Sequence, residues 1–138
     1  MAGALPPLPV VDESNASWFE GLRAHEMRIQ KCSGCGRLRH TPRPMCPACN
    51  ETAHCFERVS GRGRIWSFIV AHPPLPEGFA ARVPLPVALV ALDEDPTIRV
   101  VGELVPGTDP AELAIDAPVE AVFERLTDEL TLVRWRLV

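Results

Sequence analysis

Alternating apolar and polar residues dominate the second half of the chain and predict a series of short strands. In "GRGRIWSFIVAH", residues 61–72, apolar side chains fall on both faces, which predicts a strand at the centre of a sheet. Four more stretches of strand length are separated by acidic, glycine-rich or proline-rich turns, namely residues 84–94, 97–105, 117–126 and 130–138. Five strands with short turns predict a closed Greek-key barrel of the OB type. Ferredoxin-like and SH3-like folds are weaker alternatives.

Three details of the predicted barrel follow from single residues and one loop. Gly102 interrupts the strand over residues 97–105 and is predicted to form a β-bulge. Trp66 and Phe68 belong to the central strand, which is expected to be an interior strand of the barrel. Residues 106–114 predict a loop that contains one helical turn.

The first part of the chain has a different pattern. Residues 1–11 are rich in proline, so they are predicted to lie extended on a surface or to stay mobile. A helix is predicted over residues 13–26, capped by Asp12 or Ser14. Its predicted apolar face consists of Trp18, Phe19 and Leu22, with His25 as a weaker member. Because so short a helix is unstable alone in water, this face needs a cover, either the core of the same chain or a partner protein.

A strand over residues 27–32 is predicted to lead into four cysteines that form two Cys-x-x-Cys pairs. In that strand Met27, Ile29 and Lys31 are expected on one face. A two-residue spacer folds as a tight knuckle that aims both sulfurs at one ion, and zinc prefers four such ligands in a tetrahedron. The sequence therefore predicts a zinc ribbon whose ligands are Cys32, Cys35, Cys46 and Cys49. Disulfides are the alternative, which a reducing compartment would disfavour.

Four thiolates fill every coordination position of a zinc ion, so the predicted role of the metal is structural rather than catalytic. A fifth cysteine, Cys55, is interpreted as a buried or edge-strand thiol. His40 and His54 are alternative ligands, but we expect them to face solvent in a loop or strand. No residue is assigned a catalytic role.

Length and charge narrow the classes of partner. The 138 residues can form one ordinary domain with a small appendage. The net charge of −4 arises entirely after residue 57, where eight basic residues face twelve acidic ones, which argues against a nucleic-acid partner. No apolar run approaches the roughly 20 residues that span a bilayer, and the amino terminus lacks a signal-peptide pattern. A cytoplasmic protein without a membrane partner is therefore expected.

The order of helix, cysteine pairs and barrel resembles the zinc-ribbon plus OB-fold family known as domain of unknown function 35. The likeness extends from about residue 17 to the end of the chain. Its most specific residues are Pro42, Arg43, Cys46, Pro47 and Cys49 in the second knuckle, with Gly61 and Gly63 before the first barrel strand. The resemblance implies a mainly β protein with a proline-rich lead and helix (residues 1–30), a rubredoxin-like zinc ribbon (31–56) and a five-stranded OB barrel (57–138).

The same resemblance implies a non-catalytic accessory subunit. Members of the family are typically bound to thiolase-like or lipid-transfer-protein-like enzymes that act on acyl-coenzyme A, and some are fused to hydratase domains. We therefore expect a hetero-oligomer with a thiolase-fold partner. The expected cofactors are a structural zinc ion and a coenzyme A or acyl-coenzyme A shared with that partner.

The loop over residues 72–84, "HPPLPEGFAARVP", is predicted to contact a partner or acyl-coenzyme A, because OB folds bind ligands through their loops. His72 is the best isolated acid–base candidate, although an ordinary loop residue is the simpler interpretation. Arg62, Arg64 and Arg82 are the cations expected nearest this loop, and guanidinium groups match the phosphates of coenzyme A. Solvated edge charge is the alternative for these arginines.

Two other function classes stay open from the residues alone. A nucleic-acid-binding module is possible because ribbons and OB barrels both occur there, but it needs a basic groove with exposed aromatic side chains. A free-standing enzyme with a zinc or cysteine centre conflicts with the saturated thiolate ligation.

Overall fold

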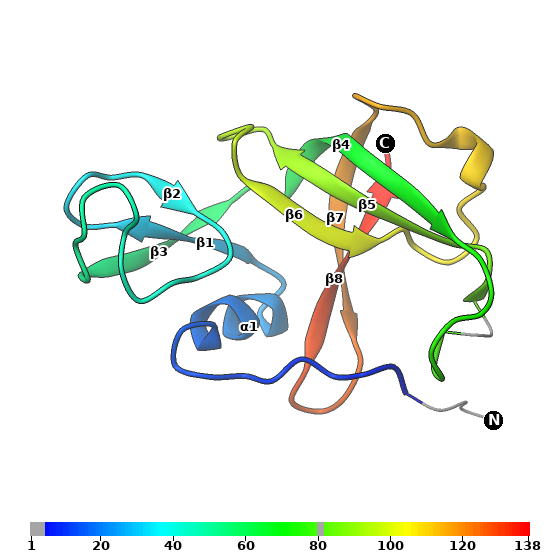
Figure 1. Ribbon diagram of the computed structural model, residues 1–138, viewed down its shortest axis with the longest axis horizontal. Coiled ribbons are helices and arrows are strands. Elements are labelled where there is room, and N and C mark those ends of the chain that lie inside the picture. Colours follow the sequence, from blue (N-terminus) through cyan, green and yellow to red (C-terminus); the bar gives the residue numbers. More distant parts are fainter. Residues whose placement is uncertain (1–4, 80–81) are drawn as a thin grey trace.

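The computed structural model describes residues 5–79 and 82–138, so the first four residues of the lead and two residues of the predicted loop lie outside it. Eight strands form two sheets, a three-stranded sheet in the order β2-β1-β3 and a five-stranded sheet in the order β6-β5-β4-β7-β8 (Figure 1). The elements are α1 (Ala16–Arg23), β1 (Met27–Cys32), β2 (Leu38–Arg39), β3 (His54–Val59), β4 (Arg62–Ala71), β5 (Leu85–Leu92), β6 (Arg99–Glu103), the 3-10 turn η2 (Pro110–Glu112), β7 (Pro118–Arg125) and β8 (Thr131–Leu137). The predicted fold class is confirmed, and so is the helical turn between the barrel strands.

The helix is shorter than its sequence pattern predicts. Asp12 accepts hydrogen bonds from the amides of Ser14 and Asn15 at 2.9 and 3.0 Å, so it orders the turn that precedes the helix. Asn15 is the N-cap residue, and it makes no side-chain cap bond. The helix ends at Arg23 because His25 adopts a positive φ of 59°. The predicted cap at Ser14 and the predicted extension beyond Arg23 are therefore wrong.

The ribbon sheet is built on β1, which pairs with both β2 and β3 in antiparallel register. Met27 and Ile29 are buried on one face of the strand, and Gln30 on the opposite face is buried too. Its side-chain amide donates to the carbonyl of Arg43 at 2.9 Å and accepts from the amide of Arg43 at 2.8 Å. This pair of bonds holds the segment between the two cysteine knuckles against β1. Lys31, on the same face as Met27 and Ile29, is only partly buried.

The barrel closes where β6 meets β8 through a parallel bridge between Leu104 and Trp135. Trp135 is fully buried, and a Cβ added to Gly102 would lie 2.9 Å from its indole. Pairing of β5 with β6 is continuous, so the predicted bulge at Gly102 is wrong. Glycine is required there because the indole occupies the space of a side chain.

The irregularity lies instead in β4, between Ile65 and Ser67. At this bulge the side chain of Trp66 turns outward and is 49% exposed, with the guanidinium of Arg99 3.7 Å from the centre of its ring. Ile69 is 62% exposed. The prediction that β4 is the central strand is confirmed by the strand order, although not all of its apolar side chains are covered.

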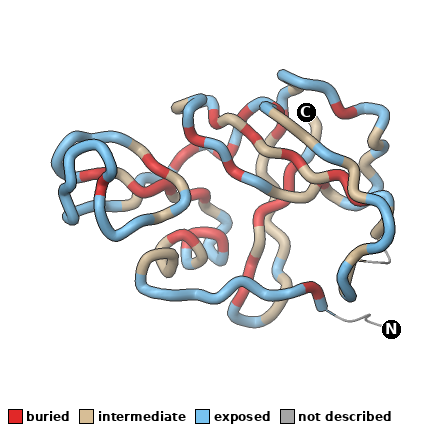
Figure 2. Tube along the Cα trace, in the orientation of Figure 1, coloured by how far each residue is buried: buried red, intermediate tan, exposed pale blue. Residues whose placement is uncertain are grey.

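The lead and the helix pack against the barrel, and the ribbon lies beyond the helix. Figure 1 shows α1 between the ribbon sheet and β8, with the lead running beneath the barrel. Pro6 is buried against Gly78, where an added Cβ would lie 2.5 Å from the nitrogen of Pro6. Figure 2 shows that buried positions follow the barrel strands, whereas most of the ribbon loops are exposed. No helix in the described part of the chain is long and apolar enough to cross a bilayer.

Candidate metal centre and apolar groove

The four predicted ligand sulfurs converge at the end of β1. All four Sγ atoms lie within 4.8 Å of one another, with Cys32 and Cys49 at 3.5 Å and Cys35 and Cys46 at 3.7 Å. Sulfurs placed about 2.3 Å from a zinc ion at the corners of a tetrahedron are about 3.8 Å apart. The spacing therefore fits one zinc ion bound by four thiolates and supports a structural metal.

Backbone amides in each knuckle point at its first cysteine. The amide of Cys35 is the main reason that the pKa of Cys32 falls to about 6, and the amide of Gly34 lies 3.3 Å from the same sulfur. In the second knuckle the amide of Ala48 is the main cause that lowers the pKa of Cys46. The amide of Glu51 also lowers the pKa of Cys49, but the thiol of Cys32 and burial outweigh it and raise that pKa to about 11. Two of the four sulfurs are thus already stabilised as thiolates, the form that binds zinc.

The remaining cysteine and the histidines do not join this cluster. Cys55 and His54 are exposed on β3, at the edge of the ribbon sheet, as the sequence predicts. The prediction that His40 faces solvent is wrong. Its ring packs against Trp18 with ring centres 4.6 Å apart, and burial lowers the pKa of His40 to about 4. His40 is therefore neutral at physiological pH.

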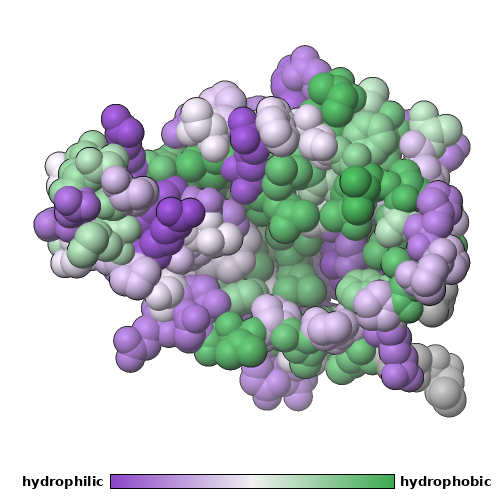
Figure 3. Space-filling model, viewed as in Figure 1, coloured by the Kyte–Doolittle hydropathy of each residue, from purple (hydrophilic) through white to green (hydrophobic). Residues whose placement is uncertain are grey.

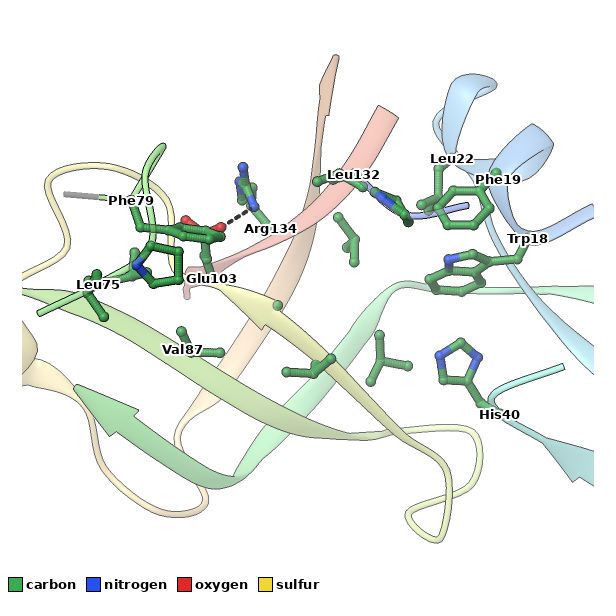
Figure 4. Close-up of a pocket in the computed structure, with 17 residues that line it drawn as sticks. Trp18, Phe19, Leu22, His40, Leu75, Phe79, Val87, Glu103, Leu132 and Arg134 are labelled. Carbon is green, nitrogen blue, oxygen red and sulfur yellow. Dashed lines mark hydrogen bonds and ion pairs between the residues drawn. The ribbon is translucent and has the colours of Figure 1, made fainter. Parts of the chain in front are cut away.

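A groove of about 500 Å³ opens beside this histidine. Its walls come from α1, β5, β6, β8 and the loop after β4, and they are almost entirely apolar. Figure 3 shows apolar side chains gathered around this hollow, and Figure 4 shows His40 and Trp18 at one end of it. The apolar side chains labelled in Figure 4 are Trp18, Phe19, Leu22, Leu75, Phe79, Val87 and Leu132. Both segments predicted to contact a partner or ligand, the helix face and the loop, thus contribute to one surface.

The opposite end of the groove carries a chain of ion pairs. Arg82 donates to Glu103 at 2.6 Å, and Glu103 also accepts from Arg134 at 2.8 Å. Arg134 donates to Glu124 at 2.9 Å, and its own side chain is only 5% exposed. Its Nη2 atom is buried without a partner among the described residues. Glu103 and Arg134 also line a second cavity of about 390 Å³, which has Arg82 in its wall.

The structure brings together only part of the predicted ligand site. Arg82 lies beside the groove, and His72 is an exposed residue directly after β4. Arg62 and Arg64 lie toward the other end of β4, about 30 and 23 Å from its last residue at about 3.3 Å per residue. There Arg64 donates to the carbonyl of Asp116, and Arg62 pairs in register with Glu120. The expectation that these two arginines lie near the loop is therefore wrong.

Sequence reasoning missed the residues at both ends of the groove. Arg134 lies in the middle of β8, which carries two arginines, and nothing in the sequence shows that Arg134 rather than Arg136 forms the buried ion pair. Glu103 is the last residue of β6 and gives no signal of this pair either. His40 is expected from the sequence to face solvent, because nothing in the sequence shows that Trp18 of α1 packs against its ring.

Comparison with known proteins agrees with this architecture. The family model described as the rubredoxin-like zinc ribbon domain of ChsH2 matches residues 19–57, and the model for the carboxyl-terminal OB-fold domain of ChsH2 matches residues 56–124. A DUF35 domain-containing scaffold protein of Pyrococcus furiosus is 32% identical over 98 residues, which cover 71% of this chain and 68% of the relative. The chain belongs to the DUF35 family. The resemblance predicted from the cysteine and glycine pattern is confirmed.

Two further relatives of this DUF35 chain bear the names of enzyme subunits. One chain of a solved structure named "Ltp2-ChsH2(DUF35) aldolase" superposes with a TM-score of 0.82 at 37% identity, covering 94% of this chain and 98% of that one. A probable enoyl-CoA hydratase alpha subunit of Thermomonospora curvata is 40% identical over 134 residues. Those residues cover 96% of this chain but only 40% of the relative, so the chain spans less than half of that protein.

Proposed function

We propose that this DUF35 protein is a non-catalytic subunit that binds a thiolase-fold enzyme of the lipid-transfer-protein-like aldolase type. The observation that carries the proposal is the likeness, over nearly the whole of both chains, to the ChsH2 chain of an Ltp2 aldolase. The name of the Pyrococcus relative, a scaffold protein, points the same way. The ligand-saturated cysteine cluster supports a role without chemistry of its own, since it leaves no position for a substrate or water.

Within such a complex, we propose that the groove receives the acyl part of an acyl-coenzyme A. Its volume lies within the range of small-molecule sites, about 300–1,000 Å³, and its walls are apolar, as an acyl chain requires. The second cavity shares Glu103 and Arg134 with the groove, so the polar arm of the coenzyme has a path past Arg82. Of the four residues predicted to bind the coenzyme, Arg82 alone is retained for this role.

The proposal is tested by measuring acyl-thioester turnover for this chain alone, for the thiolase-fold partner alone and for the two mixed. We expect the lone chain to be inactive and the mixture to exceed the partner alone, because the groove adds binding surface for the acyl group. The Arg82→Gln variant is expected to raise the KM of the mixture for acyl-coenzyme A more than it lowers kcat. Turnover by the lone chain at the rate of the mixture would overturn the proposal.

One observation favours the nucleic-acid alternative. Trp66 is half exposed beside the cation of Arg99, and exposed aromatic rings with nearby arginines are the groups that bind single-stranded nucleic acid. The acidic excess of the barrel half opposes it. Titration with single-stranded oligonucleotides over a range of salt separates the two, because affinity carried by phosphate contacts falls steeply with salt. We expect no binding that depends on salt in this way.

A further inference from the structure

The apolar groove has a different polar group at each end, and this asymmetry limits what can fill it. Figure 4 places Glu103 and Arg134 near one end and His40 near the other, with apolar side chains between them. At the first end, Arg82 and Arg134 are balanced by Glu103 and Glu124. A third carboxylate there would be repelled, whereas a neutral carbonyl would not. The end at Arg134 therefore suits the thioester or amide carbonyl of an acyl-coenzyme A.

At the other end, His40 presents a polar ring in apolar surroundings. The ring lines the groove and packs against Trp18, which is 7% exposed. Its Nδ1 atom is buried without a hydrogen-bond partner among the described residues. Rotation about the Cβ–Cγ bond exchanges ring nitrogen and carbon, so either nitrogen can be turned toward an occupant. A ligand with a purely apolar tip would exclude water from this ring and leave it without any partner.

We propose that the groove selects acyl groups whose far end carries a hydroxyl or other oxygen function, and that His40 is the residue that recognises this oxygen. The inference rests on the proposed function, since it takes the groove as the acyl site. A hydroxyl at the tip can both donate and accept, so it pairs with a neutral imidazole in either tautomer. The low pKa of His40, about 4, keeps the ring neutral throughout the range in which the complex would work.

The inference is tested with two thioesters that differ only at the tip. The probes are the N-acetylcysteamine thioesters of lauric acid and of ω-hydroxylauric acid, titrated calorimetrically into the zinc-loaded chain. For the unmodified protein we expect the hydroxylated probe to bind about three- to tenfold more tightly, which is the range for one net neutral hydrogen bond. His40→Phe keeps a ring of similar shape, so it should remove this preference while the lauroyl probe still binds.

Two further variants separate recognition from a change in fold. His40→Gln retains a hydrogen-bonding side chain and should keep part of the preference. His54→Phe makes the same substitution as the first variant on β3, where the side chain is exposed and outside the groove lining, and should leave the preference unchanged. Equal affinity of the two probes, failure of both to bind, or a preference that survives in His40→Phe would each overturn the inference. Association of His40→Phe with the thiolase-fold partner would show that the proposed subunit role still holds in any of these cases, whereas failure of both probes to bind would also remove the proposed acyl site.

Discussion

The Glu103→Gln variant tests whether the ion pairs at the end of the groove hold the barrel and the loop together. Glu103 is 14% exposed and accepts from both Arg82 and Arg134, so its loss unpairs the partly buried guanidinium of Arg82 and weakens the pairing of the buried Arg134. Breaking a buried pair by removing one partner costs about 3–5 kcal/mol. Because Glu124 still pairs with Arg134 and the glutamine oxygen still accepts one bond, we expect a loss of about 2–3 kcal/mol.

The loss is measured as the free energy of unfolding in urea, with zinc present throughout and the slope of the transition compared between proteins. Glu120→Gln is the matched control, because Glu120 pairs with Arg136 in the same sheet but at an exposed position. Exposed pairs contribute little, so the control should lose clearly less. If Glu103→Gln were no less stable than Glu120→Gln, the ion-pair chain would not stabilise this end of the groove.

Three other perturbations follow from the structure. Removing zinc with a chelator should abolish amide-exchange protection in β1, β2 and β3 while β4 to β8 stay protected, because the ribbon loops have almost no apolar core of their own. Equal loss of protection in both sheets would contradict this. Below the unfolded pKa of histidine the unfolded state binds a proton that His40 does not bind in the folded state, because desolvation lowers its pKa to about 4. The free energy of unfolding should therefore fall by at most about 3 kcal/mol as the pH drops from 6.5 toward 4, and His40→Phe should lose less over the same range. Parallel curves for the two proteins would refute the lowered pKa of His40. Gly102→Ala should lower the free energy of unfolding by about 1–3 kcal/mol and change the near-ultraviolet circular dichroism of Trp135, because the new methyl group would lie 2.9 Å from the indole. An unchanged melting temperature would show that Trp135 can move aside.

The sequence predicts the features that depend on local spacing. Two Cys-x-x-Cys pairs determine the metal centre because a knuckle is a local structure, and the alternating strands predict five barrel strands because each pattern is read within one strand. The exposure of Trp66 could not be predicted, because a bulge turns its side chain out of the alternating pattern without any sign in the sequence.

The groove was beyond prediction because it is made by contacts between distant segments. Glu103 and Arg134 pair across 31 residues, and His40, which directly follows β2, meets Trp18 because α1 packs against β1 of the same ribbon sheet. The sequence predicts Arg62 and Arg64 near Arg82 because all three lie close to the same strand, but Arg62 and Arg64 lie near the start of β4 and Arg82 follows its end. Such errors are expected wherever a site depends on which ends of the strands meet.

The central claim is that this chain works as the non-catalytic half of an acyl-coenzyme A enzyme. The most direct measurement is affinity purification of the tagged chain from its native host, followed by identification and quantification of the bound proteins by mass spectrometry. The account predicts a thiolase-fold chain in about equimolar amount. Recovery of the chain alone, with no thiolase-fold protein at a comparable level, would contradict it.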